Sequence, residues 1–186
     1  MHPETIKPKK LMHVLDKFQY CPVCGSHAFD IHNEKSKQCR ACGFIYYLNP
    51  LSATAAFILD SQGRLLVARR GKEPAKGTLD LPGGFVDMYE TGEAGILREI
   101  REETGLDLQA PRYLFSIPNR YRYSDMTLHT LDMFYCLQLP DSPAVRAADD
   151  VADLFWLPLE QVCPEDFGLQ SISQAVARFL AESLRK

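Results

Sequence analysis

The sequence predicts an α+β fold in which helices pack on the faces of a mixed sheet, preceded by a small separate segment. Strand-like apolar runs, separated by polar turns, recur through the middle of the chain. Two longer stretches instead place their apolar residues at helical spacing. Four of the six cysteines lie together near the N-terminus, outside these elements.

The length and composition are those of one good core with a small appendage. The chain has 186 residues, 46% of them hydrophobic and 24% charged, and domains commonly have about 100–150 residues. A net charge of −3 gives no basic footprint, so binding to bulk nucleic acid is not expected. No apolar run approaches the roughly 20 residues that span a bilayer, and the N-terminus lacks a signal-peptide core. We therefore expect a cytoplasmic protein with no membrane partner.

The cysteines form two pairs, in "CPVCG" and "CRACG", with 14 residues between the pairs. Two such pairs of thiolates complete a tetrahedral sulfur shell for Zn²⁺. A glycine follows each pair, as expected where the backbone turns tightly around a metal. The alternatives are two disulfides or four ordinary thiols, and a reducing cytoplasm disfavours disulfides. The predicted zinc ligands are Cys21, Cys24, Cys39 and Cys42.

The chain is expected to divide into three parts. These are a short helical lead-in over residues 1–19, a zinc ribbon over residues 20–48, and a larger domain over residues 50–186. The ribbon should contain strands in "FDIHN" and "FIYYL". It is too small for a core of its own, so bound metal would supply the missing folding energy. Its expected role is structural or the support of a homodimer.

The larger domain is expected to begin with a β-hairpin. Its strands are Ala53–Leu59 and Leu65–Ala68, joined by a polar turn that contains Gly63. The polar loop "RRGKEPAKG" and a short strand in "TLDLPGG" follow. The next element is a helix over about residues 91–104, with Gly105 as its C-terminal cap.

The rest of the chain predicts three more strands and a closing helix. The strands are expected around residues 113–117, around residues 128–139 and in "VADLFWLPL". The closing helix is amphipathic, with these apolar residues at helical spacing: Ile172, Val176, Phe179 and Leu180.

The first helix carries an unusual concentration of acid. At 100° per residue, Glu99, Glu102 and Glu103 fall within a sector of about 100°. The opposite, apolar side is expected to contain Ala94, Leu97, Ile100 and Thr104, with Ile96 near its edge. Three neighbouring carboxylates repel one another unless a cation lies among them, and Mg²⁺ or Mn²⁺ prefers such oxygen ligands. The alternative is a solvated acidic face on which Arg98 pairs with Glu102.

The spacing of the stretch resembles the complete Nudix box. Gly84, five residues, Glu90, seven residues and then "REIREETGL" occupy its fixed positions without a departure. The resemblance extends over roughly residues 50–180 and implies the α/β/α sandwich of that family. It also implies metal-dependent hydrolysis of a nucleoside diphosphate linked to another group.

The resemblance also implies roles for the residues of the box. Glu99, Glu102 and Glu103, with the carbonyl of Gly83, would hold Mg²⁺ or Mn²⁺ against the diphosphate. Glu99 or Glu103, or an acid from a later loop, would accept the proton of the attacking water. Arg98 is expected to orient a ligating carboxylate, because its spacing places it beside Glu102.

Other acids have weaker assignments. Glu90 is expected to shape the loop or to support the ligands from outside. The later-loop candidates for an extra ligand or base are Asp149, Asp150 and Asp153, although the favoured interpretation is that they are solvated loop charges.

A four-cysteine ribbon directly before such a domain resembles the NADH pyrophosphatase branch of the family. That branch carries the signature Ser-Gln-Pro-Trp-Pro-Phe-Pro-x-Ser after the box. The corresponding stretch here is "SIPNRYRYS", in which Ser116, Pro118 and Ser124 match while the Trp, the Phe and two prolines do not. The preferred substrate therefore stays open among NADH, ADP-ribose and other diphosphates.

The predicted substrate-binding residues lie in that stretch and in the earlier polar loop: Arg69, Tyr121, Arg122 and Tyr123. The tyrosines could stack on a base or a nicotinamide, and an arginine could reach a phosphate. The alternative is a hairpin whose tyrosines pack on the sheet.

Two other functional classes fit parts of the sequence. One is a binding or regulatory protein that uses the pocket without catalysis, although an intact carboxylate set argues against it. The other is a zinc-ribbon adaptor for protein or RNA. Lys35, Lys37 and Arg40 form a small basic cluster there, but Glu34 interrupts it.

Overall fold

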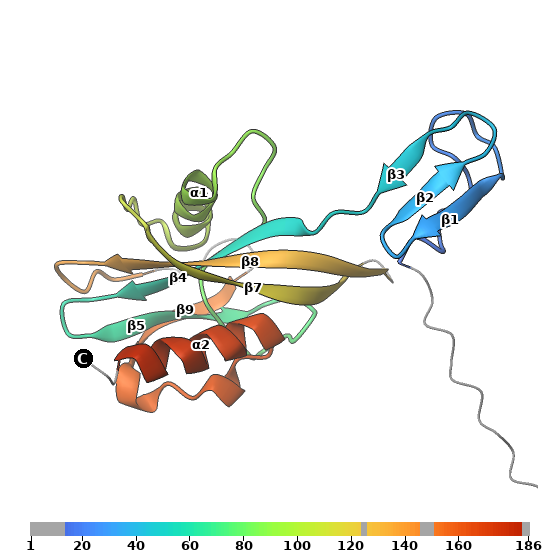
Figure 1. Cartoon of the computed structure of the whole chain (residues 1–186). Coiled ribbons are helices and arrows are strands. Elements are labelled where there is room, and N and C mark those ends of the chain that lie inside the picture. The colour runs from blue at the N-terminus through green and yellow to red at the C-terminus, as the bar shows by residue number, and fades with distance from the viewer. Residues whose placement is uncertain (1–13, 124–125, 146–150, 184–186) are drawn as a thin grey trace, which may run out of the picture. The chain divides into compact units, whose positions relative to one another are not determined.

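The computed structural model describes residues 14–123, 126–145 and 151–183, and the chain divides into two compact units between Asn49 and Pro50 (Figure 1). The first unit also takes in residues 126–127. In the part of the chain that is described, no helix is long and apolar enough to cross a membrane.

The first unit is a three-stranded antiparallel ribbon in the order β1-β2-β3. Its strands are β1 (Phe29–Asn33), β2 (Ser36–Cys39) and β3 (Ile45–Tyr47). The two predicted strands are present, whereas β2 was missed because "SKQC" has no apolar alternation. In the described part of the predicted helical lead-in, residues 14–17 form a turn rather than a helix, and residues 1–13 lie outside the described chain.

The second unit is built on a six-stranded mixed sheet in the order β6-β5-β4-β8-β7, with β9 paired to β5. The strands are β4 (Leu51–Leu59), β5 (Arg64–Arg70), β6 (Leu79–Asp80), β7 (Arg112–Tyr123), β8 (Met126–Gln138) and β9 (Val151–Pro158). β4 runs parallel to β8, and β5 runs antiparallel to β4, β6 and β9. The predicted mixed sheet is confirmed.

The predicted hairpin of β4 and β5 is present but short. The two strands pair at Leu59 and Leu65, next to the turn, after which β5 pairs with β9 along its whole length. Because the two strands diverge, the backbone of the first half of β4 can pair with another segment. That segment is the glycine turn before the first helix, residues 82–86.

Two helices cover opposite faces of the sheet (Figure 1). The helix α1 (Gly92–Thr104) packs against one face, and α2 (Gln170–Ser183) follows the short 3₁₀ turns η1 (Leu159–Gln161) and η2 (Pro164–Asp166) to cover the other. Successive residues of β4 point to opposite faces, so Ala56 and Ile58 meet α1 whereas Phe57 meets α2. The layers form the expected α/β/α sandwich.

The buried face of α1 differs in part from the predicted one. Its buried residues are Gly95, Ile96, Ile100 and Thr104, and Ala94 is exposed. The helix packs along the line of residues 96, 100 and 104, each four residues apart, so Ile96 lies at the centre of the contact rather than at its edge. In α2 the predicted apolar side is buried, with Leu180 packed at its margin.

Candidate active site and cysteine centre

The glycine turn before α1 lies alongside the first half of β4. The N–H of Ala56 donates to the carbonyl of Pro82 (2.9 Å), and the N–H of Thr54 donates to the carbonyl of Gly84 (2.8 Å). Gly83 has a φ of 151°, and a Cβ there would lie 2.1 Å from the backbone oxygen of Thr54. Glycine is therefore required at residue 83 because the turn approaches the strand backbone so closely.

Both ends of α1 are fixed by local contacts. Thr91 is the N-cap, and its hydroxyl accepts a hydrogen bond from the N–H of Ala94 (3.1 Å). Gly105 ends the helix in a left-handed conformation, with φ of 73°, and its N–H donates to the carbonyl of Arg101. The predicted ends of α1 are confirmed. Since the helix begins and ends where the sequence predicts, the side of the helix on which each glutamate lies also follows from the sequence.

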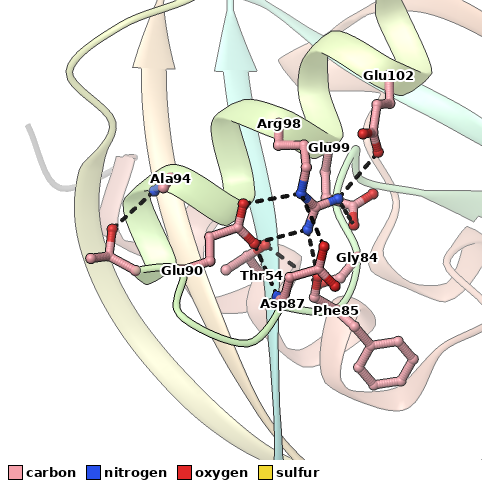
Figure 2. A network of polar contacts seen from close by, with 10 residues as sticks. Thr54, Gly84, Phe85, Asp87, Glu90, Ala94, Arg98, Glu99 and Glu102 are labelled. Atoms are coloured by element: carbon pink, nitrogen blue, oxygen red, sulfur yellow. Dashed lines mark hydrogen bonds and ion pairs between the residues drawn. The ribbon is translucent and has the colours of Figure 1, made fainter.

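Arg98 is the centre of a network that joins three glutamates (Figure 2). Its Nε and Nη2 donate to the two oxygens of Glu90 at 3.0 and 2.9 Å. Its Nη1 donates to Glu99 (2.9 Å) and to Glu102 (3.1 Å), and Nη2 also donates to the carbonyl of Phe85 (2.9 Å). A planar guanidinium suits this task, since it offers five N–H donors in a fixed geometry.

Glu90 connects this network to the loop before the helix. One of its oxygens accepts a hydrogen bond from the N–H of Asp87 (3.0 Å). The hydrogen bonds from Arg98, followed by that from Asp87, lower the pKa of Glu90 below its ordinary value. The hydrogen bonds to Glu90 in turn raise the pKa of Arg98, so the pair stays charged at neutral pH.

The remaining box carboxylates meet the glycine turn. The N–H of Gly83 donates to Oε2 of Glu103 (3.0 Å). A Cβ at Gly84 would lie 2.5 Å from the carboxyl carbon of Glu99, so the missing side chain makes room for that carboxylate. Glu102 is the most solvent-accessible of the three, with its side chain 50% exposed. Oxygen donors of this kind fit a hard divalent cation.

A cavity of about 350 Å³ adjoins Glu103. Its other lining residues are Ala68, Arg69, Arg70, Gly71, Lys72, Glu73, Asp80, Leu81, Gly83 and Tyr121. Arg69 donates to the carbonyl of Gly77 (2.9 Å) and lies over the ring of Phe155. Tyr121 packs edge-on against Phe85, with ring centroids 5.9 Å apart.

Two of the four predicted substrate-binding residues, Arg69 and Tyr121, thus line the cavity. The side chains of Arg122 and Tyr123 lie outside the described part of the structure. Sequence reasoning missed Lys72, Glu73 and Asp80 as lining residues. The available signal was the concentration of charge in "RRGKEPAKG", which indicated a loop but not where it folds.

The later acids are not brought to this cavity by the described structure. Asp153 lies in β9 opposite Arg69, is exposed, and accepts a hydrogen bond from the N–H of Leu154. Asp149 and Asp150 lie outside the described residues.

The four predicted zinc ligands form a separate centre in the first unit. Their sulfur atoms all lie within 4.8 Å of one another, with Cys21–Cys42 at 3.7 Å and Cys24–Cys39 at 3.6 Å. These separations exceed the roughly 2.05 Å of a disulfide bond, and the thiols are free. The arrangement fits tetrahedral Zn²⁺.

The two cysteine pairs lie on equivalent turns. Gly25 donates to the carbonyl of Cys21 and Gly43 to that of Cys39, each at 2.9 Å. The two glycines have φ of 72° and 78°. Burial opposes ionisation of the Cys39 thiol, but hydrogen bonds, first from the amides of Cys42 and Ala41, lower its pKa to about 7. The pKa of Cys42 shifts the other way: a hydrogen bond from the amide of Phe44 acts to lower it, but contacts with the neighbouring thiols raise it to about 12.

The basic cluster expected in the ribbon is not a cluster in the structure. Lys37 is buried, donates to the carbonyl of Phe18 (2.5 Å) and lies over the ring of Phe29. Arg40 pairs with Asp30. The basic surface on which the zinc-ribbon adaptor hypothesis depends is therefore absent from the described ribbon, because Lys37 is buried and the charge of Arg40 is neutralised by Asp30.

Comparisons with known proteins agree with this geometry. The family model described as "NUDIX domain" matches residues 49–179. The chain is 24% identical over 168 residues to an NAD-capped RNA hydrolase NudC from Stutzerimonas stutzeri, covering 90% of this chain and 56% of the relative. It is 32% identical over 118 residues to an ADP-ribose pyrophosphatase from Methanocaldococcus jannaschii, covering 62% of this chain and 66% of that relative.

A solved structure has the same fold. A NUDIX hydrolase from Nitrosomonas europaea superposes with a TM-score of 0.65 at 20% identity, covering 88% of this chain and 91% of the other. At this identity the likeness concerns the fold alone. The chain spans 56% and 66% of the length of the two sequence relatives.

Proposed function

This chain belongs to the NUDIX domain family, and from that premise we propose that it is a metal-dependent hydrolase of diphosphate linkages. Its substrate would be a nucleoside diphosphate derivative of the NADH or ADP-ribose kind. The observation that carries the proposal is the meeting of Glu99 and Glu103 at the Gly83–Gly84 turn, beside a cavity lined by charged residues. The names of the two sequence relatives support the same substrate class.

The carboxylates of the box are the proposed ligands of the catalytic metal, together with the carbonyl of Gly83. Mg²⁺ or Mn²⁺ bound at Glu99, Glu102 and Glu103 would neutralise phosphate charge and lower the pKa of a bound water. Arg98 holds Glu99 and Glu102 in fixed orientations through its Nη1 donors. In the proposed reaction Arg98 keeps its hydrogen bonds to the glutamates throughout.

Glu103 is the proposed acceptor of the proton from the attacking water. It lines the cavity, and the N–H of Gly83 fixes one of its oxygens. Glu99 lies against Gly84 and is held by Arg98 instead. A base must reach the water that attacks, and of the two it is Glu103 that faces the cavity.

Arg69 and Tyr121 are proposed to contact the parts of the substrate beyond the diphosphate. The edge-on contact with Phe85 fixes the orientation of the Tyr121 ring beside the cavity. Such a ring can stack on a base, and a guanidinium can bind a phosphate or a sugar oxygen. Arg122 and Tyr123 stay predictions of the same kind.

The cysteine centre is proposed to bind Zn²⁺ and to hold the ribbon, residues 20–48, in its fold. The domain that does the chemistry would be residues 50–186. Because free thiolates are needed, we also propose that the protein works in the reducing cytoplasm. The homodimer stays a prediction.

A product-resolved screen tests the proposed reaction. The purified full chain would be incubated with NADH, ADP-ribose, diadenosine polyphosphates and nucleotide sugars, with Mg²⁺ or Mn²⁺. We expect cleavage of the diphosphate linkage into two phosphate-bearing products, such as AMP and ribose 5-phosphate from ADP-ribose. Turnover should stop on adding EDTA and recover with either metal. Absence of turnover for every substrate would overturn the assignment in favour of a binding protein.

A further inference from the structure

The strand β5 is held by an aspartate–arginine pair at each end. At its start, Asp60 accepts from the backbone and side chain of Arg64, and at its end Asp80 pairs with Arg70. The carboxylates are nearly inaccessible at both ends, with side chains 0% and 13% exposed. The chemistry is the same, but the surroundings of the two pairs differ.

The Arg70–Asp80 pair reaches the loop between β5 and β6. Nη1 of Arg70 donates to Oδ2 of Asp80, while Nε donates to the carbonyl of Pro74 (2.7 Å). The other oxygen of Asp80 accepts from the N–H of Leu81 (2.9 Å). One partly buried ion pair therefore joins the base of the loop, its middle and the start of the glycine turn.

The rest of the loop is closed by further polar contacts. The N–H of Gly77 donates to the carbonyl of Arg70 (2.9 Å), and the hydroxyl of Thr78 donates to the carbonyl of Ala75 (2.7 Å). Ala75 has a positive φ of 63°, which a residue with a side chain adopts only when its surroundings impose it. The N–H of Gly168 donates to the hydroxyl of Thr78 (3.2 Å), which fixes the far end of the loop.

The same loop forms a charged wall of the cavity beside Glu103. Gly71, Lys72 and Glu73 line the cavity directly, next to Arg69 and Arg70 at the end of β5. Ala68 of β5 also lines the cavity, and the other lining residues come from β6 and the residue after it, the glycine turn, α1 and β7. The wall offers ammonium and carboxylate groups, which recognise hydrogen-bonding groups rather than an apolar tail.

We propose that Arg70 and Asp80 are positioning residues that hold the loop of residues 71–77, so that its cavity-lining part, residues 71–73, is the wall selecting the sugar- or phosphate-bearing part of the substrate. The inference rests on the proposed function, because it names a determinant of specificity at the same cavity. Asp60 and Arg64 provide the matched structural pair, since no residue of that pair lines the cavity. Losing the Asp80 pair should change recognition, whereas losing the Asp60 pair should change only stability.

The test compares Asp80→Asn with Asp60→Asn in the full chain. Asn at residue 80 keeps an acceptor for the N–H of Leu81 but presents no charge to Arg70. We expect KM to rise at least about tenfold for Asp80→Asn, judged from the loss of a charged hydrogen bond. The rise should differ between NADH and ADP-ribose and exceed the change in kcat, while Asp60→Asn keeps the KM values of the parent.

A cycle with Arg70→Gln asks whether the two residues act together. The change in KM for the double variant should be clearly smaller than the product of the two single changes. Hydrogen exchange should accelerate over residues 71–77 in Asp80→Asn and not in Asp60→Asn. Equal KM values in the two aspartate variants, or unchanged exchange in the loop, would overturn the inference.

Two additions keep the test decisive. If Asp80→Asn does not fold, Lys72→Ala alters the wall while both residues of the pair are retained, and an unchanged ranking of substrates would count against the wall. If the parent turns over no substrate, ADP-ribose with Ca²⁺ is the probe. Protection of residues 71–77 by that probe supports the wall although the proposed reaction fails, and no protection rejects both.

Discussion

The cysteine centre and the acidic face of α1 both gather side chains of types that can bind metal ions, but they do so by different means. The four sulfur atoms lie within 4.8 Å of one another because two equivalent glycine turns bring each pair together. Among the residues that the structure describes, no set of three carboxylates is as close as the four thiols. A guanidinium instead lies between Glu99 and Glu102, and the glycine turn holds Glu103.

The difference indicates what each centre is suited to do. A closed sulfur shell leaves no position for a substrate, as expected of a structural metal site. Carboxylates on a rigid helix beside a cavity leave coordination positions for phosphate and water. We therefore expect the cysteine centre to support folding and the carboxylates of α1 to support turnover.

The largest expected effect is the loss of the ribbon fold in Cys39→Ser. Structural Zn²⁺ binds with an apparent free energy of about 10–16 kcal/mol, and a ribbon without it has little core of its own. We expect about one zinc per chain in the parent and none in the variant. Hydrogen exchange should rise over residues 20–48 while hydrolysis still depends on Mg²⁺ or Mn²⁺.

Cys163→Ser is the matched control, because Cys163 is exposed and lies outside the centre. It should keep both the zinc and the exchange pattern. A parent without zinc, or with a Cys21–Cys24 disulfide under reducing conditions, would remove the structural half of the comparison.

The next effect is a fall of at least about 100-fold in turnover for Glu103→Gln, since a neutral amide replaces neither a ligand nor a base. The N–H of Gly83 still finds an acceptor in the new amide, so the melting temperature should change little. Glu160→Gln, at an exposed site in η1, is the control. Turnover within a few-fold of the parent would contradict the catalytic role of the helix.

A smaller loss is expected for Arg98→Lys. Lysine keeps the charge but cannot bind Glu90, Glu99 and Glu102 at once, so the carboxylates lose their common orientation. Loss of such a supporting contact typically lowers metal affinity or activity by about 10–100-fold. The Mg²⁺ concentration for half-maximal turnover should rise in this variant.

Arg101→Lys is the control for this variant, because Arg101 is exposed and its guanidinium pairs with Asp107, outside the Arg98 network. Its metal requirement should match that of the parent. If both variants behave alike, the network around Arg98 has no part in holding the ligands.

The smallest expected effect is on the acid stability of the second unit. Arg98 and the amide of Asp87 lower the pKa of Glu90, so the ionised form stabilises the fold above the unfolded pKa of about 4.3. That contribution is lost as the pH falls below this value. In Glu90→Gln the decline in unfolding free energy below about pH 4.3 should therefore be shallower than in the parent. Glu182→Gln should keep the slope of the parent, and an equal flattening there would show that Glu90 has no special share.

The sequence by itself determined the features that depend on local contacts. The ends of α1 follow from Thr91 and Gly105, which satisfy the backbone groups at the helix ends within a few residues. The cysteine turns follow from the repeated Cys-x-x-Cys-Gly pattern, because glycine tolerates the positive φ that each turn needs. The apolar pattern also fixed the two helices and most strands.

Only the tertiary structure decided the features that depend on distant partners. The strand β2 and the buried Lys37 exist because β1, β3 and Phe18 surround a polar segment. Residues 82–86 lie beside the first half of β4 because β5 pairs there with β9 instead of with β4. The cavity requires the loop after β5, the glycine turn and β7 to meet, and no periodicity in the sequence records contacts between segments so far apart along the chain.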